Sequence, residues 1–91
     1  MLEEGKIYIV KVDSGNVWLF KKHYGLYSDK TTSCDCAVCL EDMYITNDEG
    51  YICHDSEIIW IKPANENYIA ILNRAFNDNV ELQWKSKKER N

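Results

Sequence analysis

Two apolar segments near the start of the chain, separated by a short polar one, form a pattern that predicts a β-hairpin. Residues 6–12 and 17–22 are rich in β-branched and aromatic side chains, which favour extended backbone. Between them, residues 13–16 read Asp-Ser-Gly-Asn, a composition typical of a tight turn. Both segments are apolar on both faces, so we expect the sheet that they begin to be curled or covered.

Shorter extended segments follow, each bounded by turn residues. We expect strands over residues 34–40, 43–46, 51–53 and 58–61, with a turn at 47–50 and a polar corner at 54–57. Pro63 should end the last strand, because proline has no amide proton to donate to a neighbouring strand.

The apolar spacing changes after Pro63 and predicts an amphipathic helix over about residues 65–77. Apolar residues recur there at intervals of three and four, at Ile69, Leu72, Ala75 and Phe76. Asn65 suits the N-cap, and residues 77–79 (Asn-Asp-Asn) suit the end of the helix. Residues 80–84 alternate again and predict either an edge strand or a segment lying against the helix.

Together these elements predict an α+β fold in a single domain. A chain of 91 residues is one domain's worth of sequence. We expect a small antiparallel sheet or SH3-like, partly open barrel of five or six short strands, with one C-terminal amphipathic helix; a flat sheet backed by the helix is the alternative. The domain should span residues 1–84, and residues 85–91 should form a basic, frayed tail.

The charge is unevenly distributed and makes nucleic acid a poor candidate partner. The last seven residues contain four basic side chains and one acidic side chain, a charge of +3, so residues 1–84 carry −7 of the total of −4. Such an acidic body repels phosphate backbones. No apolar run reaches the length of about 18 residues that a membrane span needs. The acidic start lacks the features of a secretory signal, so we expect a cytoplasmic protein without a membrane partner.

Two parts of the sequence resemble a class of small uncharacterised proteins that are encoded in phages, prophages and other mobile elements of gut bacteria. The first is Gly5-Lys6-Ile7-Tyr8, which matches an early Gly-Lys-x-Tyr strand. The second comprises residues 50–58 and 61–65, followed by Ile69 and Leu72. The resemblance implies a β-barrel with a helix and a mobile-element context, and it implies no catalytic site.

Four cysteines form the one cluster whose spacing could carry chemistry. Cys34, Cys36, Cys39 and Cys53 could hold a structural zinc ion if residues 34–39 bend into a knuckle. In the alternative interpretation, which we favour, they are buried thiols, with Cys34 and Cys36 on one face of a strand. A redox role is less expected still, since the Cys-x-x-Cys pair does not start a helix in a βαβ unit.

The remaining candidates point to binding rather than catalysis. A cysteine nucleophile needs a histidine within reach, and His54 beside Cys53 is poorly aimed for that role, so we expect no enzyme. The favoured function is docking of a protein partner, with inhibition of a host defence protein as one form of it. Exposed aromatic anchors would come from Trp18, Tyr24, Tyr27, Trp60 or Trp84. The alternative is a small-molecule binder, as an oligomer that sequesters a ligand, with Lys21, Lys22, Lys62 and Arg74 as the candidate ligand-binding cations.

Overall fold

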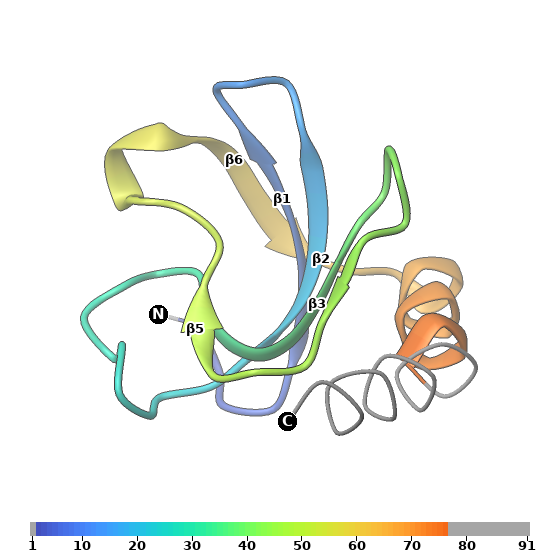
Figure 1. Cartoon of the computed structure of the whole chain (residues 1–91), viewed down its shortest axis with the longest axis horizontal. Coiled ribbons are helices and arrows are strands. Elements are labelled where there is room, and N and C mark those ends of the chain that lie inside the picture. The colour runs from blue at the N-terminus through green and yellow to red at the C-terminus, as the bar shows by residue number, and fades with distance from the viewer. Residues whose placement is uncertain (1, 77–91) are drawn as a thin grey trace, which may run out of the picture.

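One antiparallel sheet followed by a helix forms the described part of the chain, residues 2–76 of a computed structural model (Figure 1). The strands are β1 (Ile7–Val12), β2 (Val17–Lys22), β3 (Ser33–Cys39), β4 (Ile45–Thr46), β5 (Gly50–Tyr51) and β6 (Ile58–Pro63), and a 3-10 helix, η1 (Asp55–Glu57), precedes β6. Their order is β4-β3-β2-β1-β6, and β5 also pairs with β3. The sheet is not closed. The predicted α+β class, a small antiparallel sheet with one C-terminal helix, is confirmed.

The first hairpin forms where the two apolar segments and the turn between them predict it. Ile9 pairs with Leu19 in the middle of the hairpin, and both side chains are buried. Gly15 closes the turn with φ at +96°, a backbone conformation that costs glycine little, and its amide donates to the carbonyl of Val12 at 2.8 Å. Turn chemistry and strand propensity therefore agree here.

The helix begins at residue 66 and is described to residue 76. Asn65 caps it as predicted, because its side-chain oxygen accepts a hydrogen bond from the Tyr68 amide at 3.0 Å. Leu72 and Ala75 are buried against the sheet, and Tyr68 packs beside them. Phe76, expected on the same stripe, is 37% exposed and lines a pocket between the helix and the sheet together with Leu72. The predicted helix end, the segment 80–84 and the tail 85–91 lie outside the described residues.

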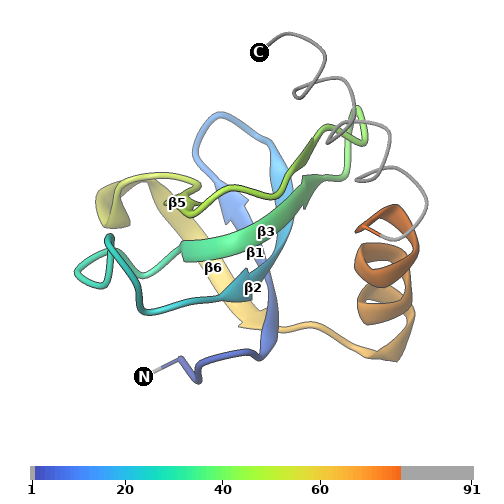
Figure 2. The same cartoon turned by 60° about the horizontal axis from the view of Figure 1, so that its bottom comes forward.

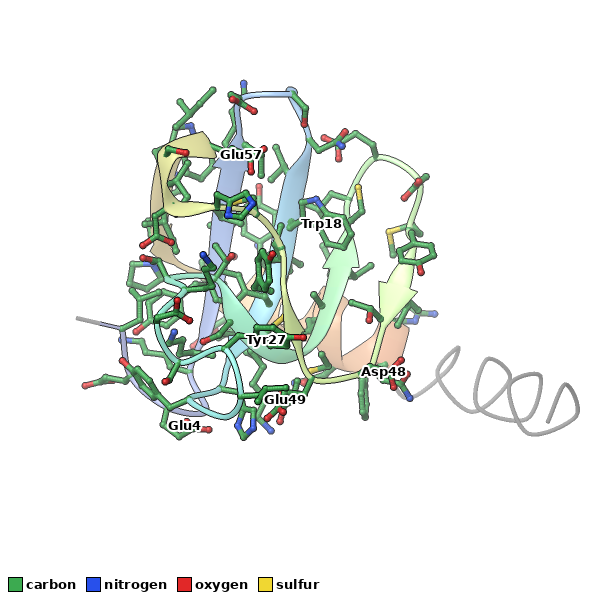
Figure 3. All side chains as sticks on the ribbon, turned by 60° about the vertical axis from the view of Figure 1, so that its left-hand side comes forward. Glu4, Trp18, Tyr27, Asp48, Glu49 and Glu57 are labelled. Atoms are coloured by element: carbon green, nitrogen blue, oxygen red, sulfur yellow. The ribbon has the colours of Figure 1, made fainter. Side chains whose placement is uncertain are left out.

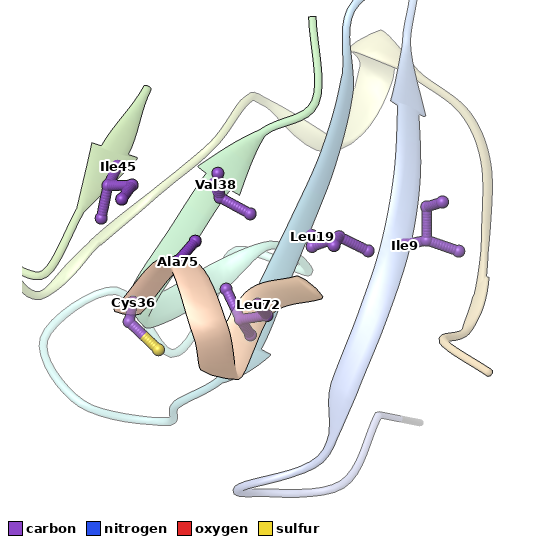
Figure 4. Packing of buried hydrophobic residues seen from close by; sticks show 7 residues of the cluster. All are labelled: Ile9, Leu19, Cys36, Val38, Ile45, Leu72 and Ala75. Carbon is purple, nitrogen blue, oxygen red and sulfur yellow. The ribbon is translucent and has the colours of Figure 1, made fainter. Parts of the chain in front are cut away.

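The sheet buries apolar side chains on both faces, as the sequence predicts. We call one face the helix face: its cluster comprises Ile9, Leu19, Cys36, Val38 and Ile45, covered by Leu72 and Ala75 of the helix (Figure 4). We call the other the loop face: its cluster comprises Tyr8, Val10, Phe20, Cys34 and Ala37, with Ile52, Ile58 and Ile61 packed against it. The helix stands on one side of the sheet only (Figure 2).

Two β-bulges change which face a side chain occupies. Lys21 pairs with Cys36 but Lys22 pairs with Cys34, so Asp35 is an additional residue in β3. Similarly, Lys11 pairs with Trp60 and Val12 with Ile58, which leaves one extra residue in β6. A bulge inverts the alternation of side chains on one side of it relative to the other. The bulge at Asp35 therefore decides where the cysteines and Lys22 point.

Candidate functional site

The four cysteines are buried free thiols that the structure distributes over both faces of the sheet. Cys36 packs in the helix-face cluster and Cys34 in the loop-face cluster. The expectation that these two share a strand face is wrong, because the bulge at Asp35 separates them. Residues 33–39 form a paired strand instead of a knuckle. Within residues 2–76, no three His, Cys, Asp or Glu side chains gather in a way that could hold a metal ion, so the proposed zinc ligands are not assembled.

Burial also keeps these thiols protonated. It raises the pKa of Cys34 to about 12 and that of Cys36 to about 11, and it is the main cause of the raised pKa values of Cys39 and Cys53. The thiolate is the form that attacks electrophiles and binds metals. At neutral pH these four side chains therefore behave as small apolar groups.

The four candidate cations do not converge on one site. Lys21 lines a pocket of about 300 Å³ between the sheet and the helix, whereas Lys22 lines a separate pocket of about 350 Å³ beside Tyr24. Lys62 lies on β6 with its ammonium 4.8 Å from the Trp60 ring centre, and Arg74 lies on the exposed part of the helix. The structure thus places Lys22 in a different pocket from Lys21.

Lys22 is a buried structural residue, only 2% exposed. Its ammonium donates to the carbonyls of Lys30 and Thr31, at 3.0 and 3.1 Å, and to the Ser33 hydroxyl at 2.7 Å. Burial lowers the pKa of this lysine, and the nearby Asp55 and Glu4 carboxylates oppose that effect. The ammonium bonds the segment between β2 and β3 to the loop face, and these bonds use all three of its protons, so none remains for a ligand.

Aromatic side chains gather on the loop-face side of the molecule in two groups. Trp18 and Tyr44 meet edge to face with ring centres 6.4 Å apart. Tyr51 contacts both Tyr27, at 5.2 Å, and His54, at 5.6 Å. A hollow of about 160 Å³ joins the two groups, since both Trp18 and Tyr51 line it. We call these five side chains the aromatic surface.

The aromatic surface is largely accessible and combines predicted with unpredicted residues. Tyr44 is 58% exposed and Tyr51 is 38% exposed. Trp18 and Tyr27, named from the sequence as candidate anchors, are half-buried. Tyr24 and Trp60 are each 37% exposed but lie outside it, and Trp84 is outside the described residues. Tyr44 and Tyr51 were missed, although both flank the turn at residues 47–50 in an acidic part of the sequence.

Acidic side chains dominate the part of the chain that contributes most of this surface. Residues 31–61 contain no lysine or arginine and seven carboxylates, namely Asp35, Glu41, Asp42, Asp48, Glu49, Asp55 and Glu57. This segment forms β3, β4, β5, η1 and most of β6. Asp48 and Glu49 lie below Trp18 in Figure 3, on the chain that leads from β4 to β5. The segment that contributes most of the aromatic surface is therefore acidic, and a basic neighbour of this surface is Lys30, whose ammonium lies 5.5 Å from the Tyr51 ring centre.

His23 connects the N-terminal segment to the acidic loop between β4 and β5 (residues 47–49). Its Nε2 atom lies 2.9 Å from Glu49 Oε1, and its Nδ1 atom lies 3.1 Å from Glu4 Oε2. The hydrogen bond to Glu4 is the main cause of the raised pKa of His23, and the bond to Glu49 adds to it. Only the imidazolium ion can donate from both ring nitrogens at once. Both nitrogens are thus engaged in holding the N-terminal segment and the β4–β5 loop.

No protein-family model matches this sequence, and neither the curated proteins nor the solved structures contain a match to it. Within residues 2–76, no helix is long and apolar enough to cross a membrane.

Proposed function

We propose that this protein is a non-enzymatic binding module that docks a lysine- or arginine-rich segment of a protein partner on its aromatic surface. The observation that carries the proposal is that Tyr44, Tyr51 and His54 lie in residues 31–61, a segment with seven carboxylates and no lysine or arginine, and that their rings contact Trp18, Tyr27 and each other. In the mobile-element context that the sequence resemblance implies, the partner would be a host or phage protein.

Aromatic side chains and charge would contribute in different ways to such docking. Tyrosine and tryptophan bury a large area at small entropic cost, which is why they are enriched among the residues that dominate binding energy. Tyr44, the most exposed of the tyrosine and tryptophan side chains of this surface, is the natural anchor. The surrounding carboxylates would speed the encounter with a basic segment and select against acidic partners.

The side chains that catalysis would use are committed elsewhere, which supports a binding role. Burial raises the pKa of every cysteine and so removes the nucleophilic thiolate. Both ring nitrogens of His23 are hydrogen-bonded, one to Glu4 and one to Glu49. The His54 ring lies against Tyr51 at a tilt of 52°, and the residue is the N-cap of η1. These arrangements serve the fold and the aromatic surface.

The test is a titration with a fluorescently labelled hexalysine peptide, followed by anisotropy at low and at physiological salt. We expect saturable binding that weakens as salt rises, with no binding of a hexaglutamate peptide. Tyr44→Ala should weaken the affinity about threefold to tenfold, because it removes an exposed ring. The matched control is Ile59→Ala, which removes a 56% exposed side chain from the bulge in β6. Absence of hexalysine binding, or an equal loss in both variants, would contradict the proposal.

A further inference from the structure

The hollow between the two aromatic groups has the size of a single side-chain end. Its volume is about 160 Å³, below the range of about 300–1,000 Å³ in which drug-sized ligands are held. Trp18 and Tyr51 form aromatic walls, Asp48 and Glu49 lie at its acidic border, and Cys34 also lines it. It suits the end of one long side chain better than a nucleotide.

Its lining favours a cation over an apolar group. Burial raises the pKa of Cys34 to about 12, so this thiol is neutral and the charge of the hollow comes from the two carboxylates. Glu49 is held in position by the His23 ring at 2.9 Å. An ammonium or guanidinium group entering here would meet π faces and negative charge together, the combination that binds such cations.

The chain's own lysines show this preference four times within residues 2–76. Their ammonium groups lie over aromatic rings at 4.4 Å (Lys22 on Tyr24), 4.8 Å (Lys62 on Trp60), 5.5 Å (Lys30 on Tyr51) and 5.9 Å (Lys6 on Tyr8). None of these four contacts involves Trp18, although tryptophan offers the strongest π face for a cation. Residues 31–61 supply all of the lining of the hollow except Trp18, and they contain no lysine or arginine. Of the four contacts, that of Lys30 is made to a lining residue, Tyr51.

We propose that this hollow receives one lysine or arginine side chain of the docked partner, with its charged end between Trp18 and Glu49. The inference rests on the proposed docking function and adds the residue that the partner must present. A neutral side chain of the same length would bind less well, because Asp48 and Glu49 would not attract it.

The experiment follows the indole N–H signals of ¹⁵N-labelled protein during titration with two blocked peptides. One contains a single lysine between glycines, and the other has norleucine in its place. We expect the lysine peptide to shift the Trp18 signal, assigned from its loss in Trp18→Phe, and the norleucine peptide to leave it unchanged. Trp60 serves as an internal control, since Lys62 already occupies its ring. Equal shifts with both peptides would overturn the proposal.

Two variants test the walls of the hollow separately. Trp18→Phe keeps an aromatic ring but weakens the cation–π contact, so affinity for the lysine peptide should fall about threefold. Glu49→Gln keeps the shape of the side chain and the acceptor for His23 but removes one charge. It should weaken binding of the lysine peptide and leave the result with the norleucine peptide unchanged. If hexalysine binds while the Trp18 signal stays still and both variants bind normally, this assignment fails and docking stands. If no basic peptide binds, both proposals fail.

Discussion

The two faces of the sheet are closed by different kinds of interaction. On the helix face, Leu72 and Ala75 cover the strands by apolar packing. On the loop face, the connecting segments are fixed by hydrogen bonds from buried polar side chains. All three buried polar residues of the described chain, Lys22, Thr32 and Ser33, bond to these connections. A face closed by polar bonds can leave aromatic rings and carboxylates at its surface, whereas a helix-covered face hides them.

The difference follows from the needs of the backbone. A helix satisfies its own amides and carbonyls, so it can cover a sheet with side chains alone. An irregular connection brings unpaired backbone groups that must find partners when buried. The Thr32 hydroxyl meets this need by donating to the Cys53 carbonyl at 3.1 Å and accepting from the Ile52 and Cys53 amides at 3.2 Å. On the loop face, specific side-chain hydrogen bonds thus fix the connecting segments, and aromatic rings and carboxylates remain accessible.

The largest expected effect comes from the apolar closure of the helix face. Leu72→Ala removes a side chain that is 2% exposed and should lower the free energy of unfolding by about 2–4 kcal/mol, measured by urea denaturation. Hexalysine binding by the fraction that remains folded should be unchanged, because the aromatic surface lies on the other side. Leu26→Ala, at a side chain that is 74% exposed, should change stability by less than about 0.5 kcal/mol. A loss of unfolding free energy in Leu72→Ala as small as that in Leu26→Ala would show that the helix contributes little to stability.

The polar closure of the loop face should depend on one of two adjacent lysines. Lys22→Ala leaves two carbonyls and a hydroxyl without their donor, and we expect a loss of about 2 kcal/mol in the free energy of unfolding. Lys21→Ala, at the exposed neighbour, should cost less than about 0.5 kcal/mol. Lys22→Met keeps most of the stem, so its stability separates the hydrogen bonds from packing. A methionine variant as stable as the original protein would refute the role of the ammonium.

Local signals predicted the elements, whereas pairing between strands decided the site. The hairpin turn and the Asn65 cap were predictable because each depends on a few adjacent residues. The face of the sheet that Cys34 and Lys22 occupy depends on the extra residue Asp35. That residue is recognised as extra only from the pairing of β2 with β3. Adjacent lysines look equivalent in a sequence, but the carbonyls that bury Lys22 come from residues 30 and 31. For the same reason the aromatic surface was only partly foreseen.

The smallest expected effect concerns pH and the attachment of the acidic loop. The pKa of His23 is raised in the folded protein, so its contribution to stability is full below the pKa of an unfolded histidine and is lost as pH rises through the folded value. The charged groups that act on it are Glu4 and Glu49, which bond to it, and Asp35. The imidazole proton signals in an NMR titration should report a pKa above about 6.5, the usual value for histidine.

Three variants make this comparison specific. Glu4→Gln should lower the pKa of His23 more than Glu49→Gln does, because the bond to Glu4 is the larger cause of the shift. A Cβ atom at Gly25 would lie 1.7 Å from Glu49 Oε1 and 2.6 Å from His23 Nε2, so Gly25→Ala must displace one of them. We expect the exposed Glu49 side chain to move, which would lower the pKa of His23 as Glu49→Gln does. An unchanged titration in Gly25→Ala would mean that His23 does not hold the β4–β5 loop, and that the acidic border of the hollow is fixed by other contacts.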